Sequence, residues 1–563
     1  MAIPTTLHDS LMARIDRLGS VRLVAQIGAA MGRQFPYALL RAVSDLPENE
    51  LRAALASLVA SELVFQRGAP PEAVYIFKHA LVQDAAHGSL LRDIRQRLHH
   101  QIAEALRVHF PELMDTQPEL LARHYAEAGI AEESAFFWGK AGTRSLARSA
   151  MTEATAQLQE GLDQLARLPE TVERMRQELE FRVALGTALR AVKGFAAPET
   201  GRAWSCARKL WEEQGSPQEF INIPFALAAY HGLRHERDLA LSLIDDVLRL
   251  SHQRNDASGL ILAYSEIGEN LMFAGELASS RSHLERALAI RGPSFQPAFF
   301  THDPLVPARG NLAIVLFCLG YPDQAWAASR ATIAEAQRLG HPASLTLSRI
   351  FDAILLSLGG DNAALDAQAG ELIAAATEHG FAVYHAQGSI FGGWAKVKCG
   401  EVPEGNRLLR SGLDAYRATG SEVWMPHYRA LLAMSLEIAG QTEEAAVSLD
   451  DALHNVERTG ERWFEAELNR YKAELLLRQG DAEAAEELFR KAMRTAREQQ
   501  AKLWELRAAV NLARLHRDRG CPGDARGILA PVYGWFTEGF DTPDLKEAKA
   551  LLDALARTGG PSY

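Results

Sequence analysis

Glycines at a constant interval dominate the second half of this 563-residue chain. One series recurs every 40 residues and a second series lies halfway between its members: Gly320, Gly360, Gly400, Gly440, Gly480 and Gly520, with Gly340, Gly380, Gly420 and Gly460. Glycine ends helices readily because it takes the left-handed backbone conformation without a side-chain clash. The spacing therefore predicts a row of stacked helical hairpins of about 40 residues each.

Residues at fixed offsets from these glycines predict how the hairpins pack. Five positions after each glycine the residue is small in most units: Ser280, Ala325, Leu365, Gly405, Ala445, Ala485 and Ala525. Small residues let paired helices approach closely. About sixteen positions before the glycine an aromatic residue recurs, and we interpret this set as packing between repeats rather than a cofactor site: Tyr384, Trp424, Trp463 and Trp504. Together these features predict an all-α, tetratricopeptide-like right-handed superhelix with lengthened helices.

One interval departs from the period. Gly275 and Gly320 are 45 residues apart, and the excess falls in the proline-rich segment RGPSFQPAFFTHDPLVPARG, where a continuous helix cannot form. Insertions in a repeat usually lie in loops, often on the binding face. Four residues of this segment are therefore our predicted ligand or partner contacts, with a purely structural loop as the alternative: Phe299, Phe300, His302 and Asp303.

The first 110 residues have a different pattern. Apolar spacing predicts helices over 7–18, from Ser20 to Gly32, over 35–43 and from Pro47, and a β-hairpin follows between Leu63 and Phe77. Several short helices followed by a hairpin are typical of a winged helix. DNA binding is one use of that fold, but the helix before the hairpin carries Glu48 and Glu50 against one arginine, Arg52. We therefore favour a domain that joins other modules.

Composition excludes some classes of function. The net charge of -11 gives no basic footprint for nucleic acid or an anionic membrane. We find no signal peptide and no apolar run long enough to span a bilayer, so we expect a cytoplasmic protein. The four cysteines have neither zinc-ligand nor disulfide spacing, and we expect them to be small buried residues.

Several segments resemble those of a known family. They are LHDSLMARIDRL (7–18), VAQIGAAMGRQF (24–35), FKHALVQDAA and RLHHQIAEAL (77–106), and LGYPDQA (319–325). Through them the chain resembles the winged-helix and tetratricopeptide-like half of bacterial AAA/STAND ATPase signalling proteins that carry a class III adenylate/guanylate cyclase or related output domain. The resemblance covers essentially the whole chain. It implies a regulatory half, either a split gene product or a truncated reading frame, that acts with a separate ATPase or cyclase polypeptide.

The catalytic motifs of that family are missing from the sequence. A Walker A loop needs G-x-x-x-x-G-K-[ST], and the nearest pair, Gly139-Lys140, lacks both the upstream glycine and the hydroxyl. We also expect no segment upstream of the winged helix to hold a cyclase domain. We therefore expect no enzymatic activity, no cofactor and no metal site. By resemblance, His79 would contact the nucleotide of an ATPase bound in trans, with a structural role at the end of a strand as the alternative.

The sequence thus predicts a winged helix of STAND/AAA type over 1–110, irregular helical pairs over 111–230, tetratricopeptide-like repeats over 231–555 and a frayed tail over 556–563. The leading functional hypothesis is a non-catalytic sensor scaffold. It would bind a protein, peptide or small effector in the superhelix groove and relay that binding to an ATPase/cyclase signalling module. The alternatives are a winged-helix transcription regulator and an ATP-binding cyclase whose catalytic domains are absent here. DNA and membrane partners are not expected.

Overall fold

The computed structural model describes residues 21–217, 220–290 and 302–558. The chain divides into two compact units, unit 1 with Met1–Ser145 and Glu153–Phe181, and unit 2 with Leu146–Thr152 and Arg182–Tyr563. The helix expected over 7–18 and the last residues of the frayed tail lie outside the described residues. Among the described helices, none is both long and apolar enough to cross a membrane.

Unit 1 contains a small antiparallel sheet among short helices. The sheet has the order β1-β3-β2. In chain order, its strands and the helices before and between them are α2 (Val21–Met31), β1 (Gln34–Pro36), α3 (Tyr37–Val43), α4 (Glu48–Ala60), β2 (Val64–Arg67) and β3 (Val74–Phe77). The β2–β3 hairpin matches the sequence prediction, but β1 was not predicted. The helix expected from Phe35 begins at Tyr37 instead, because residues 34–36 pair with β3, with Pro36 opposite Val74 on the edge strand.

Aromatic side chains join this sheet to α2. The Phe35 ring lies 5.7 Å from that of Tyr75 and 5.5 Å from that of Phe77, centroid to centroid. Gly28 on α2 faces the same ring, and a Cβ at this position would lie 2.7 Å from its carbon atoms. The absence of a side chain at residue 28 therefore lets helix and sheet approach to contact distance.

The rest of unit 1 is helical, and its helices are α5 (Ala80–Gly88), α6 (Arg92–His109), α7 (Leu113–Thr116), α8 (Pro118–Ala128), α9 (Ala131–Ala147) and α10 (Met151–Leu165). The end of α9 and the start of α10, within Leu146–Thr152, belong to unit 2. Three histidines connect α5, α6 and α8 through ring nitrogens. His87 Nε2 lies 3.2 Å from His99 Nε2, and His99 Nδ1 lies 2.9 Å from His124 Nδ1. Burial lowers the pKa of His99 to about 4 and that of His124 to about 3, so these rings are neutral at physiological pH.

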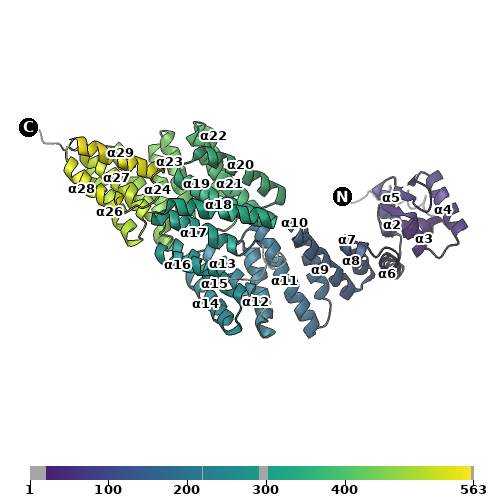
Figure 1. Cartoon of the computed structure of the whole chain (residues 1–563). Coiled ribbons are helices and arrows are strands. Elements are labelled where there is room, and N and C mark those ends of the chain that lie inside the picture. The colour runs from purple at the N-terminus through teal and green to yellow at the C-terminus, as the bar shows by residue number, and fades with distance from the viewer. Residues whose placement is uncertain (1–20, 218–219, 291–301, 559–563) are drawn as a thin grey trace, which may run out of the picture. The chain divides into compact units, whose positions relative to one another are not determined.

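Unit 2 is a tetratricopeptide-like superhelix of antiparallel helical pairs, as the glycine period predicts (Figure 1). Its first helices are α11 (Val172–Lys193), whose residues before Arg182 belong to unit 1, α12 (Pro198–Glu213), α13 (Asn222–Leu233), α14 (Arg237–Arg254), α15 (Ala257–Phe273), α16 (Leu277–Ala289), α17 (Leu305–Leu319), α18 (Pro322–Leu339), α19 (Pro342–Gly359) and α20 (Asn362–His379). The remaining helices are α21 (Ala382–Lys398), α22 (Val402–Ala418), α23 (Met425–Ile438), α24 (Thr442–Thr459), α25 (Glu465–Arg478), α26 (Ala482–Glu498), α27 (Lys502–Asp518), α28 (Pro522–Tyr533) and α29 (Pro543–Thr558).

Each glycine of the two series has the left-handed backbone that the spacing predicts. The φ angles range from 63° at Gly340 to 95° at Gly400. Three further positions carry other residues and still have positive φ. Gln500 (58°) continues the second series, while Asn255 (52°) and His235 (57°) lie 20 and 40 residues before Gly275, ahead of the 45-residue interval. The period of helix ends is therefore more regular than the period of glycines, and it extends towards the N-terminus to residue 235.

The predicted small positions are buried where paired helices meet. At the crossing of α21 and α22, a Cβ on Gly405 would lie 2.6 Å from the carbonyl oxygen of Gly393, and a Cβ on Gly393 would lie 2.8 Å from that of Gly405. Ala325 and Ala485 hold the equivalent places in other pairs and are fully buried. The small residue thus sets the distance between the two helices of a repeat.

Five helical pairs complete one turn of the superhelix, which we call a winding, so that the pairs that follow lie against the first pairs of that winding. The carbonyl of Leu233, at the end of α13, accepts a hydrogen bond of 3.0 Å from the backbone N–H of Glu422, just before α23. The carbonyl of Phe273, at the end of α15, accepts one of 2.6 Å from the N–H of Arg462, just before α25. Successive windings therefore touch, and the inside of the superhelix is surrounded by helices.

The recurring aromatic residues lie at this contact between windings. Trp424 packs on Trp463 of the next repeat at 5.2 Å, and on Phe273 of the preceding winding at 5.1 Å. Trp504 likewise lies 6.4 Å from Phe317, which is five pairs earlier. The predicted packing between repeats is present, and the same side chains also join one winding to the next.

The left-handed positions can be tested with three single substitutions. We expect Gly480→Ala to lower the free energy of unfolding by about 1 kcal/mol, because the left-handed conformation is costly for a residue with a Cβ. No atom lies within 4 Å of that Cβ, so the effect is one of backbone conformation alone. Gln500→Gly should raise the free energy of unfolding by up to about 1 kcal/mol for the same reason.

The measurement is hydrogen exchange across α25–α28 together with denaturant unfolding. Gly527→Ala is the matched control, because Gly527 lies inside α28 with equally open space around it. This control should be neutral or stabilising. Equal destabilisation by Gly480→Ala and Gly527→Ala would contradict the interpretation.

Candidate functional site

A partly open cavity of about 130 Å³ lies within the first winding of unit 2. Its walls come from the first helix of successive pairs, for example Leu233 of α13, Leu262 of α15, Ile350 of α19 and Val383 of α21. These helices surround the cavity because the chain returns after five pairs. The cavity is thus a product of the superhelical turn rather than of any single repeat.

The walls are mainly apolar and rich in aromatic rings: Phe195, Phe225, Phe273, Phe351, Tyr384, Tyr416 and Trp424. A small number of polar side chains converge on the same space: Arg190, Ser265, Glu266, Glu269, Asn270, His302 and Gln387. Apolar walls with a few converging polar groups are the usual composition of a small-ligand site. This cavity is therefore the candidate functional site.

Two carboxyl groups on α15 dominate the electrostatics of the cavity. Glu266 is 8% exposed and Glu269 is half-buried, and the two lie three residues apart on the same face of the helix. Burial raises the pKa of Glu266 to about 8, with a further contribution from the nearby Glu269. Burial also raises the pKa of Glu269, to about 7. Near neutral pH the pair therefore retains about one proton.

Amide groups are the hydrogen-bond donors to this pair. Asn270 Nδ2 donates to Glu266 Oε1 at 3.3 Å, and Asn311 Nδ2 donates to Glu269 Oε2 at 3.1 Å. No ion pair within the described residues involves either carboxyl group. The pair therefore gains hydrogen bonds but no salt bridge from the surrounding helices.

Arg190 and His302 contribute the other ionisable groups of the cavity. Burial lowers the pKa of Arg190 to about 10, and the guanidinium lies 4.6 Å from the centroid of the Phe195 ring. Burial, with repulsion from Arg190, lowers the pKa of His302 well below its usual value. At neutral pH the cavity thus holds one cation, one neutral imidazole and the carboxyl pair.

The structure places the predicted contact residues in different environments. His302 is 6% exposed and faces the cavity, with its ring 6.0 Å from that of Phe195. Asp303 is buried and caps α17, since its Oδ1 accepts a hydrogen bond of 2.8 Å from the N–H of Leu305. Phe299 and Phe300 lie outside the described residues. His79 is exposed and occupies the N-cap position of α5.

Sequence reasoning did not identify Arg190, Glu266 or Glu269. The available signal was a pair of carboxyl groups three residues apart inside LILAYSEIGENLMF, an otherwise apolar helix. Buried carboxyl groups on such a helix favour a site over a solvated face.

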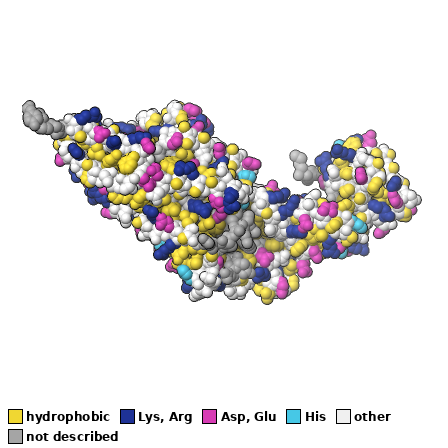
Figure 2. All heavy atoms as spheres, in the orientation of Figure 1, with side chains coloured by type: hydrophobic (Ala, Val, Ile, Leu, Met, Phe, Trp, Pro, Cys, Tyr) yellow, Lys and Arg dark blue, Asp and Glu magenta, His cyan; other side chains and the backbone are white. Residues whose placement is uncertain are grey.

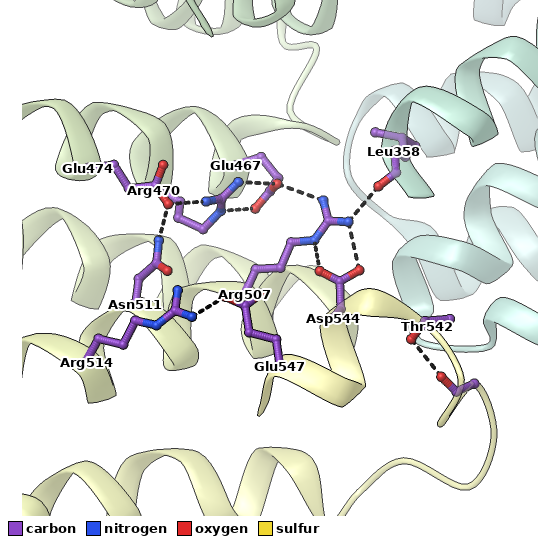
Figure 3. A network of polar contacts seen from close by, with 11 residues as sticks. Leu358, Glu467, Arg470, Glu474, Arg507, Asn511, Arg514, Thr542, Asp544 and Glu547 are labelled. Carbon is purple, nitrogen blue, oxygen red and sulfur yellow. Dashed lines mark hydrogen bonds and ion pairs between the residues drawn. The ribbon is translucent and has the colours of Figure 1, made fainter. Parts of the chain in front are cut away.

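Unit 2 has a second, partly open cavity of about 330 Å³, and this one is polar. Arg507 lines this cavity, and Figure 3 shows it within a network of polar contacts, where the guanidinium donates to both oxygens of Asp544 at 2.8 and 2.9 Å. Arg507 also donates to Glu467 Oε2 at 3.1 Å and to the Leu358 carbonyl at 2.6 Å. Glu467, which is fully buried, accepts two further bonds from Arg470. The charges balance one another, and the network joins α19, α25, α27 and α29.

Metal and thiol chemistry find little support among the described residues. They include no group of three or more histidine, cysteine, aspartate or glutamate side chains placed to hold a metal ion. The expectation that all four cysteines are buried is wrong. Cys318 is buried, but Cys206, Cys399 and Cys521 are exposed because each lies on the outer side of its helix or at a helix end.

Comparisons with known proteins give distant similarities. No protein-family model matches the chain. The chain is 26% identical over 483 residues to an uncharacterized protein of Rhizobium meliloti (strain 1021), an alignment that covers 84% of this chain and 47% of that protein. This chain thus spans about half the length of the curated relative that it matches.

Solved structures similar in arrangement are also remote in sequence. A Rap protein complexed with competence and sporulation factor is 12% identical, with a TM-score of 0.47 over 65% of this chain and 99% of that one. A STAND protein with a tetratricopeptide repeat sensor from Pyrococcus horikoshii is 12% identical, with a TM-score of 0.30 over 96% of this chain and 64% of that one. The APC/C hetero-tetramer Cut9–Hcn1 is 13% identical, with a TM-score of 0.32 over 83% of this chain and 97% of that one. Similarity at this level transfers no function.

Arg507 offers a test of the contact between windings. We expect Arg507→Met to lower the free energy of unfolding of unit 2 by about 3–5 kcal/mol, because Glu467 would lose one of its two buried cationic partners. Hydrogen exchange should increase at the end of α19 and the start of α29. Arg514→Met is the control, since Arg514 lies two turns later on α27 and forms an exposed ion pair with Glu547. An exposed pair is worth about 1 kcal/mol or less. Similar decreases in the free energy of unfolding in both variants would contradict the idea that the Arg507 network stabilises the contact between windings.

The carboxyl pair predicts an unusual dependence of stability on pH. A carboxyl group whose pKa is raised in the folded state stabilises that state at low pH, and the contribution disappears as pH rises through the folded pKa. With values near 7 and 8, the free energy of local opening of α15 should fall by about 2 kcal/mol between pH 6.5 and 8.

Hydrogen exchange of α15, corrected for intrinsic rates, measures this change. Glu266→Gln and Glu269→Gln should each make the profile flatter. Glu276→Gln, at an exposed carboxyl group just after the same helix, should leave it unchanged. The same slope in Glu266→Gln and the unsubstituted chain would show that the carboxyl pair is not the source.

Proposed function

We propose that this chain is a non-catalytic sensor scaffold in which unit 2 binds a peptide, a protein segment or a small effector through the cavity of its first winding. The observation that carries the proposal is the convergence of Arg190, Glu266 and His302 on a space with aromatic walls. Aromatic and apolar walls with a few converging polar groups are the usual composition of a small-ligand site.

We further propose that the N-terminal part relays binding to a separate ATPase or cyclase module. The order of helices α2–α4 and the β2–β3 hairpin agrees with a winged helix, and the sequence resembles the regulatory half of STAND signalling proteins. The curated relative is about twice as long, which leaves room for further domains in that protein. In such a complex the exposed His79 would lie against bound nucleotide.

A role in reading DNA has less support. Arg52, the one arginine of α4, donates to Glu48 at 2.5 Å and to the Tyr37 hydroxyl at 3.4 Å. On the face of unit 2 seen in Figure 2, basic and acidic side chains are interspersed rather than gathered into a patch of one sign. Nucleic-acid binding depends on such a patch.

A partner-capture experiment with two cavity-filling variants tests the sensor proposal. Ser265→Phe fills the first cavity and Val510→Phe fills the second, so the two are matched in kind and differ in place. We expect Ser265→Phe to reduce recovery of the bound partner or effector at least tenfold and Val510→Phe to preserve it. Circular dichroism and thermal melts check that both variants fold.

Two results would overturn the proposal. One is partner recovery that is unaffected by Ser265→Phe while the variant remains folded. The other is ATP turnover by the purified chain, because the proposal assigns no catalysis to it.

A further inference from the structure

The carboxyl groups of the first cavity have a free acceptor position that faces the space. Glu266 lies more than nine-tenths buried and lines the cavity. Its Oε1 accepts the bond from Asn270, whereas its Oε2 accepts no hydrogen bond from the described residues. This oxygen is accessible rather than fully buried, so a ligand in the cavity can donate a hydrogen bond to it.

Charge balance specifies the sign of the missing group. The ionisable groups that face the pair are Arg190 from α11, His302 ahead of α17, and the hydroxyls of Tyr384 and Tyr416 from α21 and α22. The imidazole is neutral, and burial raises the pKa of Tyr384 to about 12 and that of Tyr416 well above its usual value, so both hydroxyls are neutral. With about one proton retained, the empty pair carries about one negative charge, which Arg190 balances. A bound cation that displaces this proton leaves two negative charges facing two positive ones, so the cavity can take up one positive charge and remain neutral.

The walls specify what should carry that charge. Aromatic faces such as those of Phe273 and Trp424 favour a cation with an apolar body. The volume of about 130 Å³ is close to that of an engineered apolar cavity of about 150 Å³ that holds benzene. The body is therefore small, on the order of six to eight non-hydrogen atoms.

We infer that this cavity binds a primary ammonium group on a small apolar body, with Glu266 and Glu269 as the counter-charge. The inference rests on the proposed function, because it names the ligand chemistry of the same cavity. The ammonium donates to Glu266 Oε2 and lies beside Glu269, while the apolar body contacts the aromatic walls. Because the empty pair retains about one proton near neutral pH, binding of the ammonium releases this proton, and affinity rises with pH between 6.5 and 8.

Isothermal titration of the full chain with benzylamine and benzyl alcohol tests the charge, since the two probes have nearly the same shape. We expect benzylamine to bind at least tenfold more tightly than benzyl alcohol at pH 8. Titration in buffers of different ionisation enthalpy should show proton release. Affinity for benzylamine should rise between pH 6.5 and 8.

Matched variants assign the effect to the carboxyl pair. Glu266→Gln and Glu269→Gln should each weaken benzylamine binding at least tenfold and remove its dependence on pH, while benzyl alcohol binding stays the same or improves. Glu276→Gln should change neither. Thermal melts identify any variant that fails to fold. In that case the proton release measured on the unsubstituted chain still tests whether ammonium binding ionises the carboxyl pair.

The outcomes separate this inference from the broader proposal. If benzyl alcohol binds as tightly as benzylamine, the ammonium inference is overturned and the cavity remains a ligand site. If neither probe binds, the inference is again overturned, and partner capture with Ser265→Phe decides the sensor function independently. Nα-acetyl-lysine amide compared with benzylamine distinguishes a lysine side chain of a peptide from a free amine as the natural source.

Discussion

The return of the chain after five helical pairs is the constraint on which the rest of unit 2 depends. The ends of α13 and α15 accept backbone hydrogen bonds from residues just before α23 and α25. The tryptophans at these joints fill the space beside the bonds. A looser superhelix would separate the two windings and open the first cavity along one side. Both the buried arginine network and the candidate ligand site therefore result from the same superhelical turn.

Local features of the fold could be predicted from the sequence because they depend on residues close together in the chain. A glycine every 20 residues marks a helix end wherever the helix lies in space, and the small residue five positions later follows from the contact within one pair. Even so, Asn255 and Gln500 take the left-handed conformation without being glycine. Strand β1 was missed because three residues contain too few positions for a pattern.

The candidate site could be predicted only in part, because its residues meet through the pitch of the superhelix. Arg190, Glu266 and Trp424 come from different repeats, and no short-range pattern encodes how many repeats complete a turn. The insertion drew attention to His302, which does face the cavity, and to Asp303, which caps a helix instead. Glu266 and Glu269 were overlooked because most carboxyl groups on helices are solvated, and nothing in the sequence alone distinguished these two from that majority.

Contact between windings also changes how unit 2 should lose its structure. In an ordinary repeat protein each unit touches only its neighbours, so stability is a sum along a line and the ends can unravel one repeat at a time. Here α19 is joined through Arg507 to α27 as well as to adjacent helices. Each repeat therefore contacts its neighbours along the chain and also repeats of the other winding. Loss of one repeat exposes buried surface in both directions. Such a network should melt in blocks of a whole turn.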